Sequence, residues 1–332
     1  MKRTMFLAAG AATILSACGG GGGNPGTTGP APVQTATLTP ITAANSTSVA
    51  SNAYDATVAI SESSTELTGL LTGVSVTGAR ISTVSPVLTL VRRAARAPQL
   101  LAGVTTSESC AGGGTVTIDA TIRNQNVISN GDSMTLTARN CIEDGTILDG
   151  AMSITFSNMS GDILNSWVYG ATMDTRFSNF NIASGGDKIG VNGDMKLVVN
   201  QSSASAGSAS ISGKSLQLNE QQSGAAALNA ILTDYAMTGS TQGATTSSAA
   251  SFTLSGSSAG LGQFAYTVKN VQPFVTSGSA MPGSGALIVD GAASSVTATV
   301  VANGMRLDYS AKGDGVITQT NTLGWTEFLS AI

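Results

Sequence analysis

Residues 115–122, Thr-Val-Thr-Ile-Asp-Ala-Thr-Ile, alternate between polar and apolar side chains, and this alternation decides the fold. A period of two sends successive side chains to opposite faces of a β-strand, so we predict a strand with one buried face. The same alternation recurs along the chain as far as residue 309. It is found at Met134-Leu136-Ala138, Met152-Ile154-Phe156, Met195-Leu197-Val199, Leu216-Leu218, Phe252-Leu254, Phe264-Tyr266-Val268, Leu287-Val289, Val296-Ala298-Val300 and Met305-Leu307-Tyr309.

Short turn signals separate most of these segments: Asn130-Gly131-Asp132, Gly185-Gly186-Asp187, Asn192-Gly193-Asp194 and Asn303-Gly304. About a dozen strands with such short connections imply antiparallel pairing, because parallel pairing needs crossover helices that the sequence does not offer. We therefore expect a mainly β fold. It should be a large curved antiparallel sheet or a sandwich over residues 106–332, preceded by a short, partly helical segment.

The N-terminus has the layout of a cleaved secretion signal. Lys2 and Arg3 precede an apolar run of 13 residues, Met5–Ala17, and Cys18 follows two small residues. The run is shorter than the roughly 20 residues that span a bilayer. An ordinary signal peptide with an incidental cysteine is the competing interpretation.

The stretch Leu15-Ser16-Ala17-Cys18 resembles the lipobox of bacterial lipoproteins. The resemblance implies a signal peptide at residues 1–17 and a lipid, with chains such as palmitate, on Cys18. It also implies attachment to the bacterial cell outer membrane, because the next residue is Gly19 and not the aspartate that signals inner-membrane retention. The periplasmic and the surface face both remain open.

Residues 18–39 are rich in Gly and Pro and are predicted to form a flexible tether. Residues 40–105 are predicted to be partly helical, with apolar side chains at helical spacing between Pro86 and Ala97. Arg92, Arg93 and Arg96 lie in that stretch. They are interpreted as a solvated helix face or, alternatively, as a contact for anionic headgroups or a partner.

With Cys18 assigned to the lipid, Cys110 and Cys141 remain, and in an oxidising compartment they are expected to form a disulfide. In an antiparallel pair, the numbers of directly opposed residues have a constant sum. Val116 and Ile118 lie on the same face as Met134 only if this sum is even, whereas 110 and 141 have an odd sum. The cysteines are therefore not directly opposed in a regular ladder. We expect a bulge or loop at residues 112–114, with the disulfide clamping the open end of the hairpin.

Composition excludes several classes of function. The chain has a net charge of −4 and only 10% charged residues, which argues against nucleic-acid binding. It has no histidine, which excludes Ser-His-Asp and Cys-His catalysis and histidine-ligated zinc. No cofactor is expected.

Two motifs invite a catalytic interpretation. Gly256-Ser257-Ser258-Ala259-Gly260 fits the G-x-S-x-G pattern, which needs a histidine base and a strand-to-helix turn, so we interpret it as accidental. Lys188 or Lys214 would be the alternative base for a serine, but both adjoin turn glycines and are expected to be solvated. Paired carboxylates of a histidine-free hydrolase remain a remote alternative, and Trp167 and Trp325 are few aromatics for a sugar cleft.

Acidic turns raise the question of calcium, but they lack the twelve-residue hand loop and the Gly-Asp nonapeptide array. No metal site is predicted, and a single structural calcium ion remains open. The turns are Glu143-Asp144-Gly145 with Asp149-Gly150, Gly186-Asp187 and Gly313-Asp314-Gly315. Trp325 and Phe328 are expected to dock the C-terminal tail on the sheet.

Two stretches resemble a loosely defined group of uncharacterised β-rich proteobacterial lipoproteins: Cys110-Ala111-Gly112-Gly113 with Gly131-Asp132 and Asn140-Cys141, and Pro282–Leu287 with Gly313-Asp314-Gly315. The group has no agreed activity, so the resemblance supports the fold alone. We expect a non-catalytic structural or interaction module, anchored to the membrane through Cys18, with an envelope protein as partner. The alternative is a lipid-binding or apolar-ligand transfer protein with a β-lined cavity. It is suggested by Met134, Met152, Met173, Met195 and Met305, because methionine suits irregular apolar surfaces, although plain core is the simpler interpretation.

Overall fold

The computed structural model describes residues 37–57, 104–124, 127–143, 145–163, 166, 168–221, 228–258, 260–278 and 281–331. The chain divides into two units, Met1–Thr35 and Ala36–Ile332, and all of these residues belong to the second. The lipobox with Cys18, the predicted helix at Pro86–Ala97 with its three arginines, and Trp167 lie outside the described residues.

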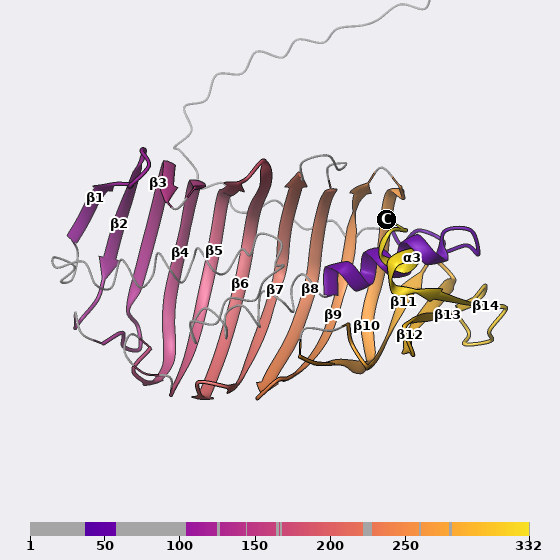
Figure 1. The fold of residues 1–332 in the computed structure, drawn as a ribbon. Helices are drawn as coiled ribbons and strands as arrows, with labels where there is room; N and C mark the ends of the chain where they lie inside the picture. Colours follow the sequence, from indigo (N-terminus) through magenta and orange to yellow (C-terminus); the bar gives the residue numbers. More distant parts are fainter. Residues whose placement is uncertain are drawn as a thin grey trace, which may run out of the picture. The chain divides into compact units, whose positions relative to one another are not determined.

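Within the described residues, 14 antiparallel strands form one sheet in which every strand pairs with its neighbours in sequence (Figure 1). The strands are β1 Val104–Ser109, β2 Thr115–Thr121, β3 Ser133–Glu143, β4 Thr146–Gly161, β5 Tyr169–Ser184, β6 Asp187–Ser203, β7 Ala206–Gln221, β8 Leu228–Gln242, β9 Thr245–Ser258, β10 Gly262–Ser277, β11 Ser284–Gly291, β12 Ser294–Val301, β13 Gly304–Ser310 and β14 Gln319–Gly324. β1 and β14 form the two ends of the sheet. The predicted mainly β fold is confirmed. Of the two architectures expected from the sequence, a curved sheet or a sandwich, the structure has a single sheet, and this sheet is not closed.

The period-two pattern is confirmed as the origin of the sheet's two faces. In β2, Val116, Ile118 and Ala120 are buried, whereas the residues between them are half-buried or exposed. The same alternation continues across the sheet, so one face is apolar and the other carries mainly Ser, Thr and Asn. The apolar face therefore supplies the core.

The interpretation of Asn192-Gly193-Asp194 as a turn between strands was wrong. These residues lie inside β6, which runs unbroken for 17 residues, and the pairing of β6 with β7 shifts register between Gly193 and Lys196. Gly193 has a φ of +127°, and its Cβ would lie 2.2 Å from the carbonyl oxygen of Ser215. Bulges and hairpin turns both use residues with positive φ, so the same dipeptide marks either.

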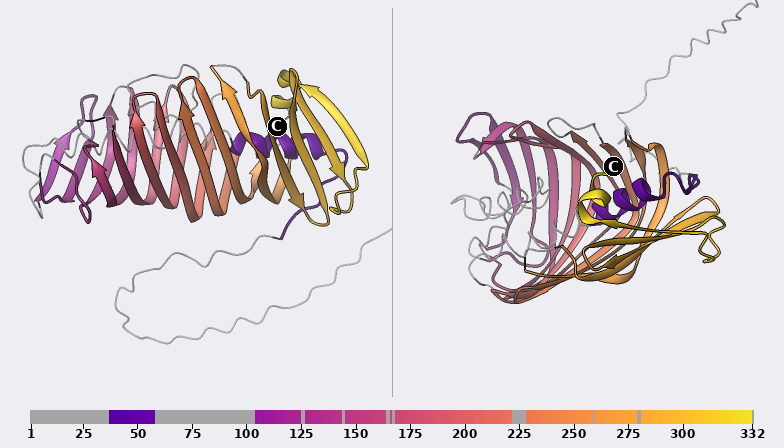
Figure 2. Two further views of the ribbon diagram at one scale, coloured as in Figure 1. Left: turned by 90° about the horizontal axis from the view of Figure 1, so that it is seen from below. Right: turned by 45° about the vertical axis from the view of Figure 1, so that its right-hand side comes forward.

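Further bulges interrupt the long strands, and neighbouring side chains satisfy the backbone groups that they release. Asn140 and Asn179 both have positive φ, near +47° and +48°. The backbone N–H of Asn140 donates to the carboxylate of Asp149 on β4 at 3.0 Å, and that of Asn179 donates to the side-chain oxygen of Asn192 on β6 at 3.4 Å. Because bulges increase local twist and bend, they account for the curvature of the sheet in Figure 2.

The hairpin of β2 and β3 has the predicted register, and the predicted disulfide is present beside it. Val116 pairs with Ala138, and Cys110 is bonded to Cys141 across a Cα–Cα distance of 5.4 Å. Residues 110–114 form the turn between β1 and β2, as expected for the three glycines. Gly114 has a φ of +74°, and its Cβ would lie 1.9 Å from the carbonyl oxygen of Asn140, so only glycine fits there.

A helix at residues 46–57 covers the apolar face near β10 (Figures 1 and 2), which confirms the partly helical segment as far as it is described. Its Tyr54 ring lies 5.2 Å from the ring of Phe274 on β10 and 5.6 Å from that of Phe328. Phe328 belongs to α3 (Trp325–Leu329) and is fully buried. The prediction that Trp325 and Phe328 dock the tail is confirmed, and both pack against Tyr54.

The segment before this helix is also fixed to the sheet. Thr39, the last residue of the predicted tether, donates its N–H to the carbonyl of Ala265 at 2.8 Å and accepts from the N–H of Ala292 at 3.0 Å. The N–H of Ile41 donates to the hydroxyl of Ser294 at 2.7 Å. The attached part of the chain therefore begins before residue 40.

Candidate functional site

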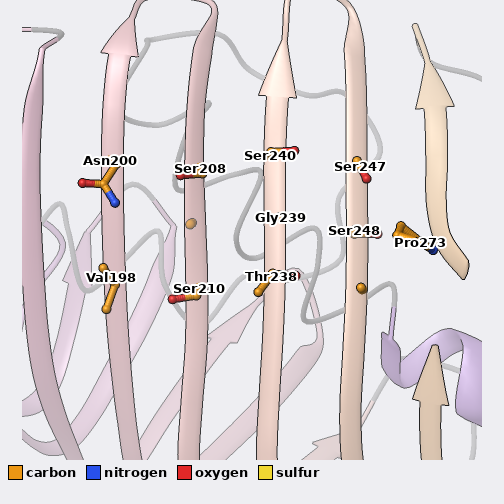
Figure 3. A pocket seen from close by; sticks show the side chains of 12 residues that line it. Val198, Asn200, Ser208, Ser210, Thr238, Gly239, Ser240, Ser247, Ser248 and Pro273 are labelled. Carbon is orange, nitrogen blue, oxygen red and sulfur yellow. The ribbon is translucent and has the colours of Figure 1, made fainter. Parts of the chain in front are cut away.

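A hollow of about 270 Å³ lies on the polar face of β6–β9 (Figure 3). Its outer row consists of Asn200, Ser208, Ser240 and Ser247, which the strand register places directly opposite one another. Residues opposed in an antiparallel ladder share a face, so their side chains form one row of hydroxyl and amide groups.

A second row lies two residues further along the same strands, at Val198, Ser210, Thr238 and Ala249. The remaining lining residues are Ala209, Gly239 and Ser248, which lie between the two rows in sequence, and Pro273 on β10. None of the lining residues is charged, so the hollow offers hydrogen-bond donors and acceptors without an acid, a base or a nucleophile activator. In the sequence, β6, β7 and β9 are recognisable only as alternating segments, and β8 is not among the predicted strands. Ser and Thr on an outward face signal solvent exposure and not a particular ligand.

Asp194, Lys214 and Asp234 form a charged cluster where the bulges of β6 and β8 meet β7. The Lys214 ammonium lies 2.7 Å from the Asp234 carboxylate. The Asp194 carboxylate accepts from the backbone N–H groups of Lys214 and Ser215 at 3.0 and 3.3 Å. The Asp194 carboxylate therefore holds the backbone of β7 in place.

Lys214 is as solvated as predicted, with a side chain that is 86% exposed. Its hydrogen bond to Asp234 raises the pKa of the ammonium. A lysine that serves as a general base needs a lowered pKa, produced by burial or by neighbouring cations. The environment of Lys214 raises its pKa, which makes the amine less suited to act as a base.

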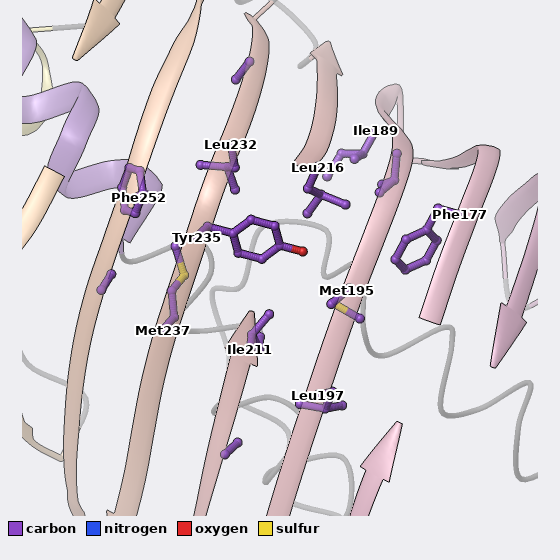
Figure 4. Close-up of a cluster of buried hydrophobic side chains, with 14 of the residues drawn as sticks. Phe177, Ile189, Met195, Leu197, Ile211, Leu216, Leu232, Tyr235, Met237 and Phe252 are labelled. Carbon is purple, nitrogen blue, oxygen red and sulfur yellow. The ribbon is translucent and has the colours of Figure 1, made fainter. Parts of the chain in front are cut away.

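Tyr235 anchors the core beneath this cluster, where Figure 4 shows it beside Met195 and Leu216. Its hydroxyl donates to the backbone carbonyl of Asp194. Burial raises the pKa of the Tyr235 phenol, with a further contribution from the charge of Asp194. Gly213 leaves the space for the hydroxyl, since a Cβ there would lie 2.5 Å from it.

The G-x-S-x-G match lies at a hairpin and not at a strand-to-helix turn. Ser257 and Ser258 end β9, and β10 begins at Gly262. The Ser258 hydroxyl accepts from the backbone N–H of Leu261 at 3.2 Å. Its observed role is to stabilise the turn.

The acidic turns are not brought together in the described residues. Asp149 binds the bulge at Asn140, and Asp314 accepts from the N–H of Val316 at 3.0 Å and from the Ser310 hydroxyl at 3.2 Å. The metal-ligand grouping found in this part of the chain is Cys110, Cys141 and Glu143, in which the disulfide occupies both sulfur atoms. A disulfide does not provide thiolate ligands, so this grouping offers one carboxylate.

The described helices include none that is both long and apolar enough to cross a membrane. No family model matches the chain, and neither the curated proteins nor the solved structures contain a match to it.

Proposed function

We propose that this chain is a membrane-anchored cell-envelope lipoprotein that acts as a non-catalytic structural or interaction module. The anchor is supported by the lipobox-like stretch that ends at Cys18. The role as a module is supported by the extended sheet, whose polar face over β6–β9 contains a hollow lined by uncharged, mostly hydroxyl-bearing residues.

The observation that carries the proposal is the structural use of the carboxylates. At bulges of the sheet, Asp149 accepts one backbone N–H group and Asp194 accepts two. Asp132, which is buried, accepts from the N–H groups of Ser129 and Arg123 at 2.7 and 3.3 Å. A carboxylate that accepts backbone N–H groups forms charge-assisted hydrogen bonds and positions the chain, as expected for a scaffold.

The anchor is tested by comparing the full chain with its Cys18→Ser variant in the bacterial envelope. We expect the wild-type chain in the membrane fraction, with a mass increase at the N-terminal cysteine that corresponds to a lipid. Cys18→Ser should abolish the mass increase and release the chain to the soluble fraction. An unmodified, soluble wild-type chain would refute the anchor.

Binding of an apolar ligand is the second candidate function. It is favoured by the single curved sheet, because within the described residues no second sheet packs against the apolar face. The five methionines named above all lie in strands and are buried. Mass spectrometry of an organic extract of the purified full chain distinguishes the two candidates: a stoichiometric lipid besides the anchor favours ligand binding, and its absence favours the module.

A further inference from the structure

The two ends of the sheet differ in how well they are protected against pairing with another strand. At β1, the side chain of Glu108 lies on the apolar face, opposite buried Val116. An inward-pointing charge on an edge strand disfavours the addition of a further strand. β14 has no such protection: it contains no charged residue and no proline, and its pairing with β13 has no register shift.

The strand register shows which backbone groups of β14 point away from the sheet. The N–H of Trp325 donates to the carbonyl of Asn303 at 3.4 Å, in register with the β13–β14 pairs. Inward and outward groups alternate along an antiparallel strand, so Gln319, Asn321 and Leu323 direct their N–H and C=O groups to β13. Thr320, Thr322 and Gly324 direct theirs outward.

This outward edge is accessible. Residues 311–322 are all exposed, and β14 lies at the end of the sheet in Figures 1 and 2. Val316 and Ile317, just before β14, are 62% and 56% exposed, which is unusual for two adjacent large apolar residues. Alternating backbone donors and acceptors beside an apolar contact are the features that an added β-strand recognises.

We infer that β14 pairs antiparallel with β14 of a second copy of this chain. A two-fold axis at Asn321 places Thr320 of each copy opposite Thr322 of the other, so that the outward groups of both residues pair with each other. Opposed threonines stabilise cross-strand pairs, and no like charges meet, because β14 is uncharged. The same register brings Ile317 toward Trp325 of the second copy. In the single chain, the Trp325 side chain is only half-buried and can accept this contact.

The contact is short, and it rests on the proposed role as an interaction module. Two copies attached to one membrane have a high effective concentration, so a short ladder is sufficient to associate them. In this arrangement the partner of the module is a second copy of the same chain.

The experiment uses the full chain with Asn321→Cys, because residues at the two-fold axis are non-hydrogen-bonded partners. Their Cα atoms would lie about 4.5 Å apart, within the range of about 4.4–6.8 Å that disulfides span. After mild oxidation in the membrane, and again in detergent, non-reducing electrophoresis should show a covalent dimer several-fold stronger than that of Thr135→Cys. Thr135 is an exposed control position on β3, far from β14 in sequence and outside the hollow on β6–β9.

Thr322→Pro, combined with Asn321→Cys, removes one outward N–H and leaves the groups that bind β13 in place, since proline is tolerated on an edge strand whose N–H faces solvent. It should abolish the dimer, whereas Thr322→Val should retain it. Circular dichroism of each full-length variant confirms that the fold is kept. A dimer band no stronger than in Thr135→Cys, or one unchanged by Thr322→Pro, would overturn the inference. Fractionation and the mass of the N-terminal cysteine in the same samples report separately whether Cys18 anchors the chain, so failure of the anchor and failure of the β14 pairing are distinguished.

Discussion

Gly213 shows how one residue without a side chain makes room for a buried polar group. An added Cβ would lie 2.5 Å from the Tyr235 hydroxyl and 2.7 Å from the carbonyl oxygen of Asp194. We expect Gly213→Ala to lower the free energy of unfolding by about 1–3 kcal/mol, because a tightly packed site resists added volume. Denaturant titration measures the change, with Gly283→Ala as a control whose Cβ meets nothing within 4 Å. If Gly213→Ala and the wild-type chain had equal free energies of unfolding, the Tyr235 side chain would be able to move away from the added Cβ without loss of stability.

Tyr235 also predicts a dependence of stability on alkaline pH. Burial raises the pKa of both Tyr235 and Tyr266 above the value of about 10 expected in the unfolded chain. Near pH 10 the unfolded state loses phenolic protons that the folded state keeps, so the free energy of unfolding falls as pH rises above this value.

Denaturant unfolding at a series of alkaline pH values measures this slope. Tyr235→Phe removes one titrating group and should make the slope shallower by up to about 1.4 kcal/mol per pH unit, the value for one proton. Identical slopes for the two proteins would mean that Tyr235 is accessible to ionisation in the folded state.

At the scale of the strand, bulges allow a chain of Ser, Thr and small apolar residues to form long, curved strands. Asp194 connects the bulge of β6 to β7 by accepting two backbone N–H groups. Asp194→Ala would leave both donors without this acceptor and should lower the free energy of unfolding by about 1–2 kcal/mol. Asp194→Asn keeps one acceptor oxygen and should have a smaller effect. Urea titration compares the three proteins, and equal losses for Ala and Asn would place the effect in the charge and not in the hydrogen bonds.

At the scale of the whole folded unit, segments from opposite ends of the sequence meet on the apolar face. Tyr54 contacts the rings of Phe274, Trp325 and Phe328. Tyr54→Ala should lower the free energy of unfolding by about 3–5 kcal/mol, as expected for removing a buried aromatic ring, and should expose residues 37–57 to protease. Tyr54→Phe keeps the ring contacts and serves as the control. Unchanged proteolysis of Tyr54→Ala would show that the hydrogen bonds of Thr39 and Ile41 hold this segment by themselves.

Local pattern was sufficient to predict ten of the 14 described strands, the even register of Val116 with Ala138 and the disulfide of Cys110 and Cys141, but not β1, β5, β8 and β14. Each depends on side-chain alternation or on cysteine number, which neighbouring residues determine. The same information failed at Asn192-Gly193-Asp194, because a positive φ is shared by turns and bulges and the choice depends on the strands on either side.

The sequence by itself determined that this protein is an antiparallel β-protein without histidine chemistry, because side-chain period and composition are properties of the chain alone. Only the tertiary structure decided that the strands form one open sheet with an unprotected β14 edge, and that Tyr54 packs against Phe328. The hydroxyl-lined hollow on β6–β9 likewise depends on how the strands pair in the tertiary structure. These features depend on pairing between residues far apart in sequence, which is selected by the packing of the whole apolar face and not by any local stretch.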